Sequence, residues 1–167
     1  MKKLFLYALV VACMAMTVDA NAQKVAYIDA ETIIQEMPDY KKAKSEVEAY
    51  GKQLQNQLKA EEEKVMKYYQ DVMQKAQQGL LSPAQQKQEE EKLQGMQQSL
   101  QTKAVEADQK LAAKEGELTK PLYEKFNNAL KSVAKEKGYG YIIDKKLMLY
   151  SGGGVDATIA VKAKLGL

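Results

Sequence analysis

Apolar side chains recur every eleven residues along most of this chain, from residue 40 to residue 137. In the first part of the stretch the two apolar rows are Ala43, Leu54, Val65 and Ala76, and Val47, Leu58, Tyr69 and Leu80. In the second part they are Leu100, Leu111, Leu122 and Val133, and Met96, Ala107, Leu118 and Ala129. This period corresponds to about 3.67 residues per turn, which predicts long, nearly straight α-helices. Two rows can pair two helices but are too narrow for a globular core.

The helical stretch breaks once, at residues 79–83. Gly79 accepts the left-handed backbone that ends many helices. Ser82 is a good N-cap, Pro83 suits the first helical position, and Gln85 completes a capping box with Ser82. We therefore expect a helical hairpin with its tip at this break. The turn predicts four facing pairs: Leu54 with Ala107, Leu58 with Ala104, Val65 with Met96, and Tyr50 with Leu111.

Short strands are expected on both sides of the hairpin, at residues 24–28, 139–143 and 147–150. The first precedes a short helix that Asp29 can cap and that ends before Pro38. The other two are joined by residues 144–146, which predicts a tight β-hairpin. A final short helix follows the glycine-rich loop at residues 151–154.

The expected fold class is α+β, with a helical arm (residues 40–137) on a small antiparallel β body (residues 23–39 and 138–167). Three strands leave two open sheet edges, and the body is too small to supply a large core of its own. Strands from other copies would close these edges, so we expect an oligomer. The candidate interface residues are Val25, Tyr27, Ile28, Tyr141, Ile142, Ile143, Leu147 and Leu149.

Residues 1–22 have the features of a secretory signal peptide. Lys2 and Lys3 precede an apolar run, and the small residues Ala20 and Ala22 mark a cleavage site that leaves Gln23 at the new N-terminus. Cys13 and the residues before it loosely resemble a lipoprotein cleavage box, but the apolar run continues beyond Cys13, so lipidation is the less favoured alternative. Export predicts a periplasmic protein.

The composition argues against catalysis and nucleic-acid binding. The chain has no His, and its one Cys lies in the expected signal peptide, so the mature chain lacks a nucleophile–base pair of the usual kind. No catalytic, metal-binding or cofactor-binding site is expected. All 25 basic residues are lysine, interleaved with glutamate to a net charge of +3. Base-specific nucleic-acid recognition favours arginine, so nucleic acid is not an expected partner.

Residues on both sides of the arm carry a family resemblance. They are VAYID at 25–29 and MPDYKKA at 37–43, then KPL at 120–122 and GYGYIID at 138–144. With these motifs the chain resembles the Skp/OmpH family of periplasmic chaperones. The resemblance implies a homotrimer with a β-barrel body and three arms around a cavity. It also implies ATP-independent holdase activity on unfolded outer-membrane β-barrel proteins, and a contact with the outer membrane or its assembly machinery.

One feature of the arm departs from the family pattern. Family arms are often strongly basic near the tip, whereas residues 64–92 here hold five lysines against four carboxylates. Flexible thioethers and phenol rings suit contacts with varied clients. The client-contact candidates are Met66, Tyr68, Met73, Leu80 and Leu81. Packing within the hairpin is the alternative for each of them, and it is favoured for Tyr69 and Met96.

Flexibility is expected where the helical pattern is interrupted. Pro121 removes a backbone hydrogen bond inside a helix, and with Gly116 and Gly51 it forms the set of hinge candidates. Glu61 and Glu115 are expected to interrupt the apolar rows. The alternative function is that of a structural spacer or adaptor in the cell envelope, which would need a rigid arm. These interruptions favour the holdase.

Overall fold

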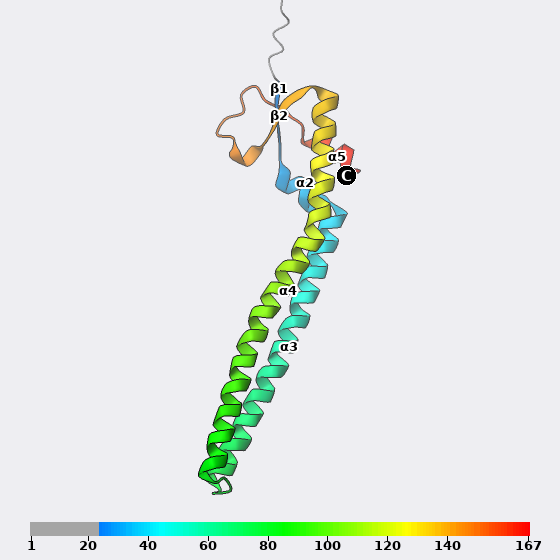
Figure 1. Ribbon diagram of the computed structural model, residues 1–167. Helices are drawn as coiled ribbons and strands as arrows, with labels where there is room; N and C mark the ends of the chain where they lie inside the picture. Colours follow the sequence, from blue (N-terminus) through cyan, green and yellow to red (C-terminus); the bar gives the residue numbers. More distant parts are fainter. Residues whose placement is uncertain (1–23) are drawn as a thin grey trace, which may run out of the picture.

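The structure is a computed structural model, and it describes residues 24–167. The expected signal peptide and Cys13 lie outside these residues. In chain order the elements are β1 (Lys24–Ile28), α2 (Ala30–Glu36), α3 (Pro38–Gln77), α4 (Pro83–Lys137), β2 (Tyr139–Asp144), the 3₁₀ turn η1 (Lys145–Leu147), β3 (Val155–Asp156) and α5 (Thr158–Leu165). Long helices dominate, and the sheet is small (Figure 1).

The helices α3 and α4 lie side by side and antiparallel, and they form the arm (Figure 1). They contain 40 and 55 residues, which corresponds to lengths of about 60 and 80 Å. The turn chemistry is confirmed: Gly79 has φ +71°, and Ser82 and Gln85 form a capping box ahead of Pro83. The turn at Gly79 and the capping box of Ser82 and Gln85 thus stabilise the hairpin. Each provides hydrogen-bond partners for backbone groups at a helix end that would otherwise have none.

The sheet is parallel, so the antiparallel body predicted from the sequence is wrong. β1 lies in the middle, with β2 and β3 parallel to it on either side. The reason lies in the helix lengths. α4 is longer than α3 by 15 residues (55 against 40), and it continues past the base of the arm to the end of the sheet where β1 begins. β2 therefore starts where β1 starts, and it runs in the same direction.

The expected hairpin at residues 144–146 does not form. The Asp144 carboxylate accepts a hydrogen bond from the Lys146 backbone N–H at 2.9 Å, and η1 follows at once. The chain then crosses to the other side of β1, where Ala26 pairs with Val155. Residues 147–150, expected as a strand, lie in this crossover, and Leu149 is fully exposed. Parallel strands need such a connection, which a tight turn cannot supply.

The core of the body lies on one face of the sheet. Ala26 and Ile28 of β1 are buried there, while Val25 and Tyr27 alternate to the other face. The helices α2, α4 and α5 cover the buried face with Ile33, Met37, Leu122, Phe126, Ala129, Val133 and Val161. The C-terminal part of α4 therefore belongs to the body, while the rest of the helix belongs to the arm.

Candidate functional site

The seam of the arm has the expected register. Leu54 and Ala107 are both buried and line the same groove, and Val65 and Met96 line another. A Cβ atom added to Gly51 would lie 3.6 Å from the Leu111 side chain, so the two helices approach closely there. The facing pairs Leu54 with Ala107 and Val65 with Met96 are thereby confirmed.

One of the four apolar rows is only half correct. Tyr69 is 44% exposed, whereas Tyr68 is partly buried between the helices. The residues that face the seam from Glu61 onward are Glu61, Val65, Tyr68 and Val72, at spacings of 4, 3 and 4. These spacings add up to eleven residues, and the row Ala43, Leu54, Val65 and Ala76 also stays on the inner side. The eleven-residue period is therefore kept, but Tyr68 takes the inner position that the pattern assigned to Tyr69.

Tyr68 has two polar partners on α4. Its hydroxyl donates a hydrogen bond to the Glu89 carboxylate, and the Lys92 ammonium lies 4.5 Å from the centre of its ring. An ammonium over a phenol ring is attracted by the negative face of the ring. These contacts join the two helices near the tip, so the client-contact candidate Tyr68 also has a packing function within the hairpin.

Glu61 interrupts the seam, as expected, and it has two lysine partners. Its carboxylate lies 2.8 Å from Lys64 Nζ and 3.2 Å from Lys103 Nζ on the other helix. Hydrogen bonds from Lys64 and Lys103 hold the pKa of Glu61 below its ordinary value. A groove of about 260 Å³ lies on one side of this cluster and another of about 80 Å³ on the other. The helices are therefore loosely packed here.

Glu115, also expected to interrupt the seam, is exposed instead. Lys114 takes the inner position, with 32% of its side chain exposed and its ammonium 3.4 Å from Glu117. A lysine can place its aliphatic stem against the neighbouring helix while the ammonium reaches water. The apolar seam is thus interrupted at Lys114 rather than at Glu115.

The remaining client-contact candidates lie on the outer surface of the distal arm. Met66, Met73 and Leu80 are 57%, 41% and 64% exposed, and Leu81 is partly buried in the turn. Val105 of α4, which the sequence reasoning missed, is also exposed. A large apolar residue outside the apolar rows was the signal that could have identified it. Exposed apolar groups on a thin arm are available to a partner.

At the base of the arm, α4 continues through Pro121 without a break. The proline ring has no N–H for the carbonyl of Glu117, and two residues earlier the Thr119 hydroxyl donates to the carbonyl of Glu115 at 2.7 Å. Both features favour bending of a helix. Asp39 of α3 and Lys125 of α4 form an ion pair of 2.7 Å beside this segment.

The three hinge candidates differ in their surroundings. Gly51 faces Leu111 in the seam, while a Cβ atom on Gly116 would have no neighbour within 4 Å. Pro121 is exposed and lies beside a groove of about 340 Å³ between the helices. The structure therefore brings Pro121 to the junction of arm and body and leaves Gly51 and Gly116 within the arm.

The candidate interface residues of the body fall into two groups. Ile28 and Ile142 pack against the chain's own core. Val25, Tyr141 and Ile143 are exposed and Tyr27 is partly buried, all on strands of the sheet, and Leu147 and Leu149 are exposed in the crossover that follows β2. The first group stabilises the single chain, whereas the second is free to contact another surface.

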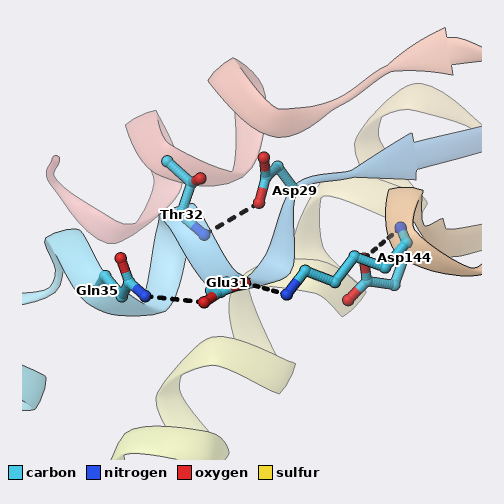
Figure 2. A network of polar contacts seen from close by, with 6 residues as sticks. Asp29, Glu31, Thr32, Gln35 and Asp144 are labelled. Carbon is cyan, nitrogen blue, oxygen red and sulfur yellow. Dashed lines mark hydrogen bonds and ion pairs between the residues drawn. The ribbon is translucent and has the colours of Figure 1, made fainter.

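A polar network beside the sheet joins the segment that follows β1 to segments that follow α4 (Figure 2). The Asp29 carboxylate accepts from the Thr32 backbone N–H at 3.0 Å, and the Asp29 backbone N–H donates to the Thr158 hydroxyl at 3.0 Å. Asp156 accepts from the Thr158 backbone N–H at 2.9 Å. These hydrogen bonds hold the pKa values of Asp29 and Asp156 below their ordinary values. The start of α2 and the start of α5 are thereby fixed to each other.

One lysine, Lys146, completes this network. The Lys146 ammonium pairs with the Glu31 carboxylate, which also accepts from Gln35 at 3.0 Å (Figure 2). The pairing with Glu31 raises the pKa of Lys146. Sequence reasoning identified Asp29 as a helix cap but not its hydrogen bond to Thr158, because these two residues lie 129 positions apart in the chain.

Two structural searches of residues 24–167 were negative. No group of three or more His, Cys, Asp or Glu side chains in this part of the chain is placed to hold a metal ion. Nor does any helix in it have the combined length and apolar character needed to cross a bilayer. What the arm presents is an elongated surface that bears charged, carboxamide and exposed apolar side chains.

Comparisons with known proteins identify the family and the fold. A family model described as outer membrane protein (OmpH-like) matches residues 24–165. Among solved structures, a candidate outer membrane chaperone (OmpH-like) from Caulobacter crescentus CB15 is similar, with a TM-score of 0.72 and 16% sequence identity. The match covers 84% of this chain and 82% of the other, and at this identity it establishes the fold. A search of curated proteins found no match.

Proposed function

This chain belongs to the family of OmpH-like outer membrane proteins, and from that membership we propose that it is an ATP-independent periplasmic holdase. Its clients are unfolded outer-membrane β-barrel proteins, which it keeps soluble for delivery to the outer membrane. The observation that carries the proposal is the arm. Two helices of 40 and 55 residues share a narrow seam, while Met66, Met73 and Leu80 remain exposed.

The proposed assembly is a homotrimer held by the sheets. β2 and β3 each have one edge without a partner strand in the described chain, and Val25, Tyr141 and Ile143 are exposed on strands of the same sheet. Open edges and an exposed apolar face on so small a body favour association with further copies. Three sheets that join at these surfaces would form a barrel, with three arms around one cavity.

Capture by such an assembly has to be weak at each contact and multivalent. Alternate side chains of an unfolded barrel strand are apolar, so a client offers many equivalent contact points. Three arms raise the effective concentration of further contacts once the first has formed. Each contact can then release thermally, without a nucleotide. The polar break at Glu61 and the segment around Pro121 support this mechanism, because an arm that bends adapts to clients of different size.

A mixing experiment tests the proposed function. Mature protein would be combined with an outer-membrane barrel protein diluted from urea, and light scattering would report aggregation while size-exclusion chromatography reports the complex. We expect a soluble complex without ATP, in which one client is bound per trimer. A folded, water-soluble protein of similar mass is the control and should not bind. Aggregation of the client at the same rate with and without the protein would refute the holdase.

The proposed location rests on residues 1–22 alone. Mass spectrometry of the protein from the periplasmic fraction should show a chain that begins at Gln23, with no lipid. A chain that begins at Cys13 and carries a lipid-sized mass increase would show that the lipoprotein alternative is correct.

A further inference from the structure

The large apolar side chains that are exposed on the described arm helices share one flank. They are Met66, Tyr69 and Met73 on α3, and Val105 and Tyr123 on α4. Successive helical residues are rotated by about 100°, so position along the sequence gives the side of the helix relative to the seam. On α3, Tyr69 and Met73 follow the seam residues Val65 and Val72 in the direction of rotation. On antiparallel helices, the same rotation leads to a common flank.

Glutamines lie on the same flank. The α3 row continues from Met66, Tyr69 and Met73 to Gln77 and Leu80, and the α4 row, which lies level with α3 residues nearer the base of the arm, consists of Gln94, Gln97, Gln101 and Val105. All of these residues are exposed. We call these nine residues the uncharged flank. Two carboxylates border this flank: by the seam register, Glu62 lies level with Gln97 and Gln101, and Glu90 lies level with Tyr69 and Met73.

The opposite flank carries the charges. It contains the cluster of Glu61 with Lys64 and Lys103 and the groove of about 260 Å³ beside it. The ion pairs Asp71–Lys75 and Glu106–Lys110 and the contact of Lys92 with Tyr68 lie on it as well. We call it the charged flank. The two flanks of the distal arm therefore differ in their side chains. Pairing of the helices does not explain this difference, because it depends only on the inner residues of the seam.

We propose that the uncharged flank is the surface that binds the client, an unfolded polypeptide in extended conformation; this inference rests on the proposed holdase function. Such a chain exposes two chemistries. Its apolar side chains fit the flexible thioethers of Met66 and Met73 and the ring of Tyr69. Its unpaired main-chain N–H and C=O groups fit glutamine carboxamides, which donate and accept at once. On the charged flank, by contrast, the ammonium and carboxylate groups are paired with each other.

This assignment has a consequence for salt dependence. Salt screens exposed charges, with a Debye length of about 10 Å at 0.1 M, but it leaves carboxamide hydrogen bonds and apolar contacts largely unaffected. Client affinity should therefore change little between low and high salt. Capture by the charged flank would instead weaken steeply as salt is added, so a salt titration of the unmodified protein separates the two flanks.

Two matched triple variants provide the main test. One is Met66→Gln with Tyr69→Gln and Met73→Gln on the uncharged flank. The other is Lys64→Gln with Lys67→Gln and Lys75→Gln, which lie on the charged flank or the outer surface of the same helix. Glutamine is a good helix former, and these six positions are exposed. For an unfolded barrel protein we expect Kd to rise about tenfold or more in the first variant, the equivalent of about 1.4 kcal/mol, and less than about threefold in the second.

Site-specific crosslinking covers the case in which a triple variant fails to fold. A photoreactive amino acid would replace either Gln97 on the uncharged flank or Ser99, which lines a groove of the charged flank two residues away. We expect crosslinks to the client from Gln97 and few from Ser99. Equal crosslinking, or a larger loss of affinity in the lysine variant, would overturn the inference and leave the holdase function intact. Failure of the unmodified protein to bind any client would refute the proposed function itself.

Discussion

Glu61 of α3 and Lys103 of α4 meet across the arm, with 3.2 Å between the carboxylate oxygen and the ammonium nitrogen. Glu61 takes the place of an apolar residue in the seam, and the exposed Lys103 of α4 pairs with it. The pair stands between two grooves, lined by Leu54 and Leu58 on one side and by Val65 and Leu100 on the other. The charges thus hold the helices in register where apolar packing is loose.

Replacing Glu61 with Leu should make the arm more stable and less flexible. The leucine can fill the space beside Leu58, and Lys103 remains solvated because 47% of its side chain is exposed. We expect a higher Tm and slower hydrogen exchange at Val65 and Leu100. Glu62→Leu, on the exposed surface, is the control and should leave exchange there unchanged. A lower Tm for Glu61→Leu would show that the ion pair contributes more than apolar packing.

The seam register predicts a specific disulfide. Cysteines at Leu58 and Ala104 should form an intramolecular crosslink on mild oxidation, because facing seam positions lie within the reach of a disulfide. Leu58→Cys with Asp108→Cys, shifted by one helical turn, is the matched control and should crosslink poorly. Preferential crosslinking of the shifted pair would place the tip elsewhere than at Gly79.

Two neighbouring isoleucines of β2 should respond differently to a charge. Ile142 packs against the core of its own chain, so Ile142→Asp should unfold the body at a cost of about 3 kcal/mol or more. Ile143 is 36% exposed on the sheet, and Ile143→Asp should break the assembly while the single chain keeps its helices. Light scattering gives the mass, and circular dichroism gives the helix content. An unchanged mass in Ile143→Asp would exclude this residue from the interface.

Pro121→Ala should stiffen the base of the arm. Alanine restores the N–H that the Glu117 carbonyl lacks, and the gain in local helix stability is up to about 3 kcal/mol. Hydrogen exchange of residues 110–130 should slow, the trimer should survive, and affinity should change most for the largest clients. Gly116→Ala, which meets no neighbour, is a second hinge variant with a gain of about 1 kcal/mol. Slower exchange with unchanged affinity for small and large clients would show that the proline produces only a static bend.

The polar network predicts how stability depends on pH. The pKa values of Asp29 and Asp156 are lower in the folded chain than the ordinary value of 3.8, so their contribution is present above that value and is lost as the pH falls below it. The pKa of Lys146 is raised above 10.5, so its contribution is lost only at higher pH. The urea concentration at the midpoint of unfolding should therefore be nearly constant around neutral pH and should decrease in acid. The double variant Asp29→Asn with Asp156→Asn should lose less stability in acid than the unmodified protein. An equal loss in both proteins would show that these two carboxylates do not cause the pH dependence.

Local chemistry was enough to predict the hairpin. Gly79, Ser82 and Gln85 determine the turn through backbone conformation and capping, and the turn then determines which seam residues face each other. The inner row Leu100, Leu111, Leu122 and Val133 followed from periodicity alone. These features depend on residues within a few turns of each other, so a single sequence contains them.

Relationships between distant segments could not be predicted in this way. The direction of β2 depends on the 15-residue difference between α3 and α4, and β3 has only two residues, too few for any alternation to be visible. Tyr68 takes the place of Tyr69 in the seam, and two adjacent tyrosines offer no local signal that tells the inner one from the outer one. Lys103 was not recognised as the partner of Glu61, since an exposed lysine among many carries no distinguishing signal.

The central position of β1 has a consequence for the order of folding. β1 is the first described element to leave the ribosome, yet both of its partner strands follow α4, and the bond from Asp29 to Thr158 spans 129 residues. The arm helices can close from the tip through short-range contacts, whereas the sheet must wait for the far end of the chain. A chain interrupted before Val155 would keep a paired arm but lack the strand that completes the sheet. Formation of the sheet is therefore a late step, and it reports that synthesis has passed α4.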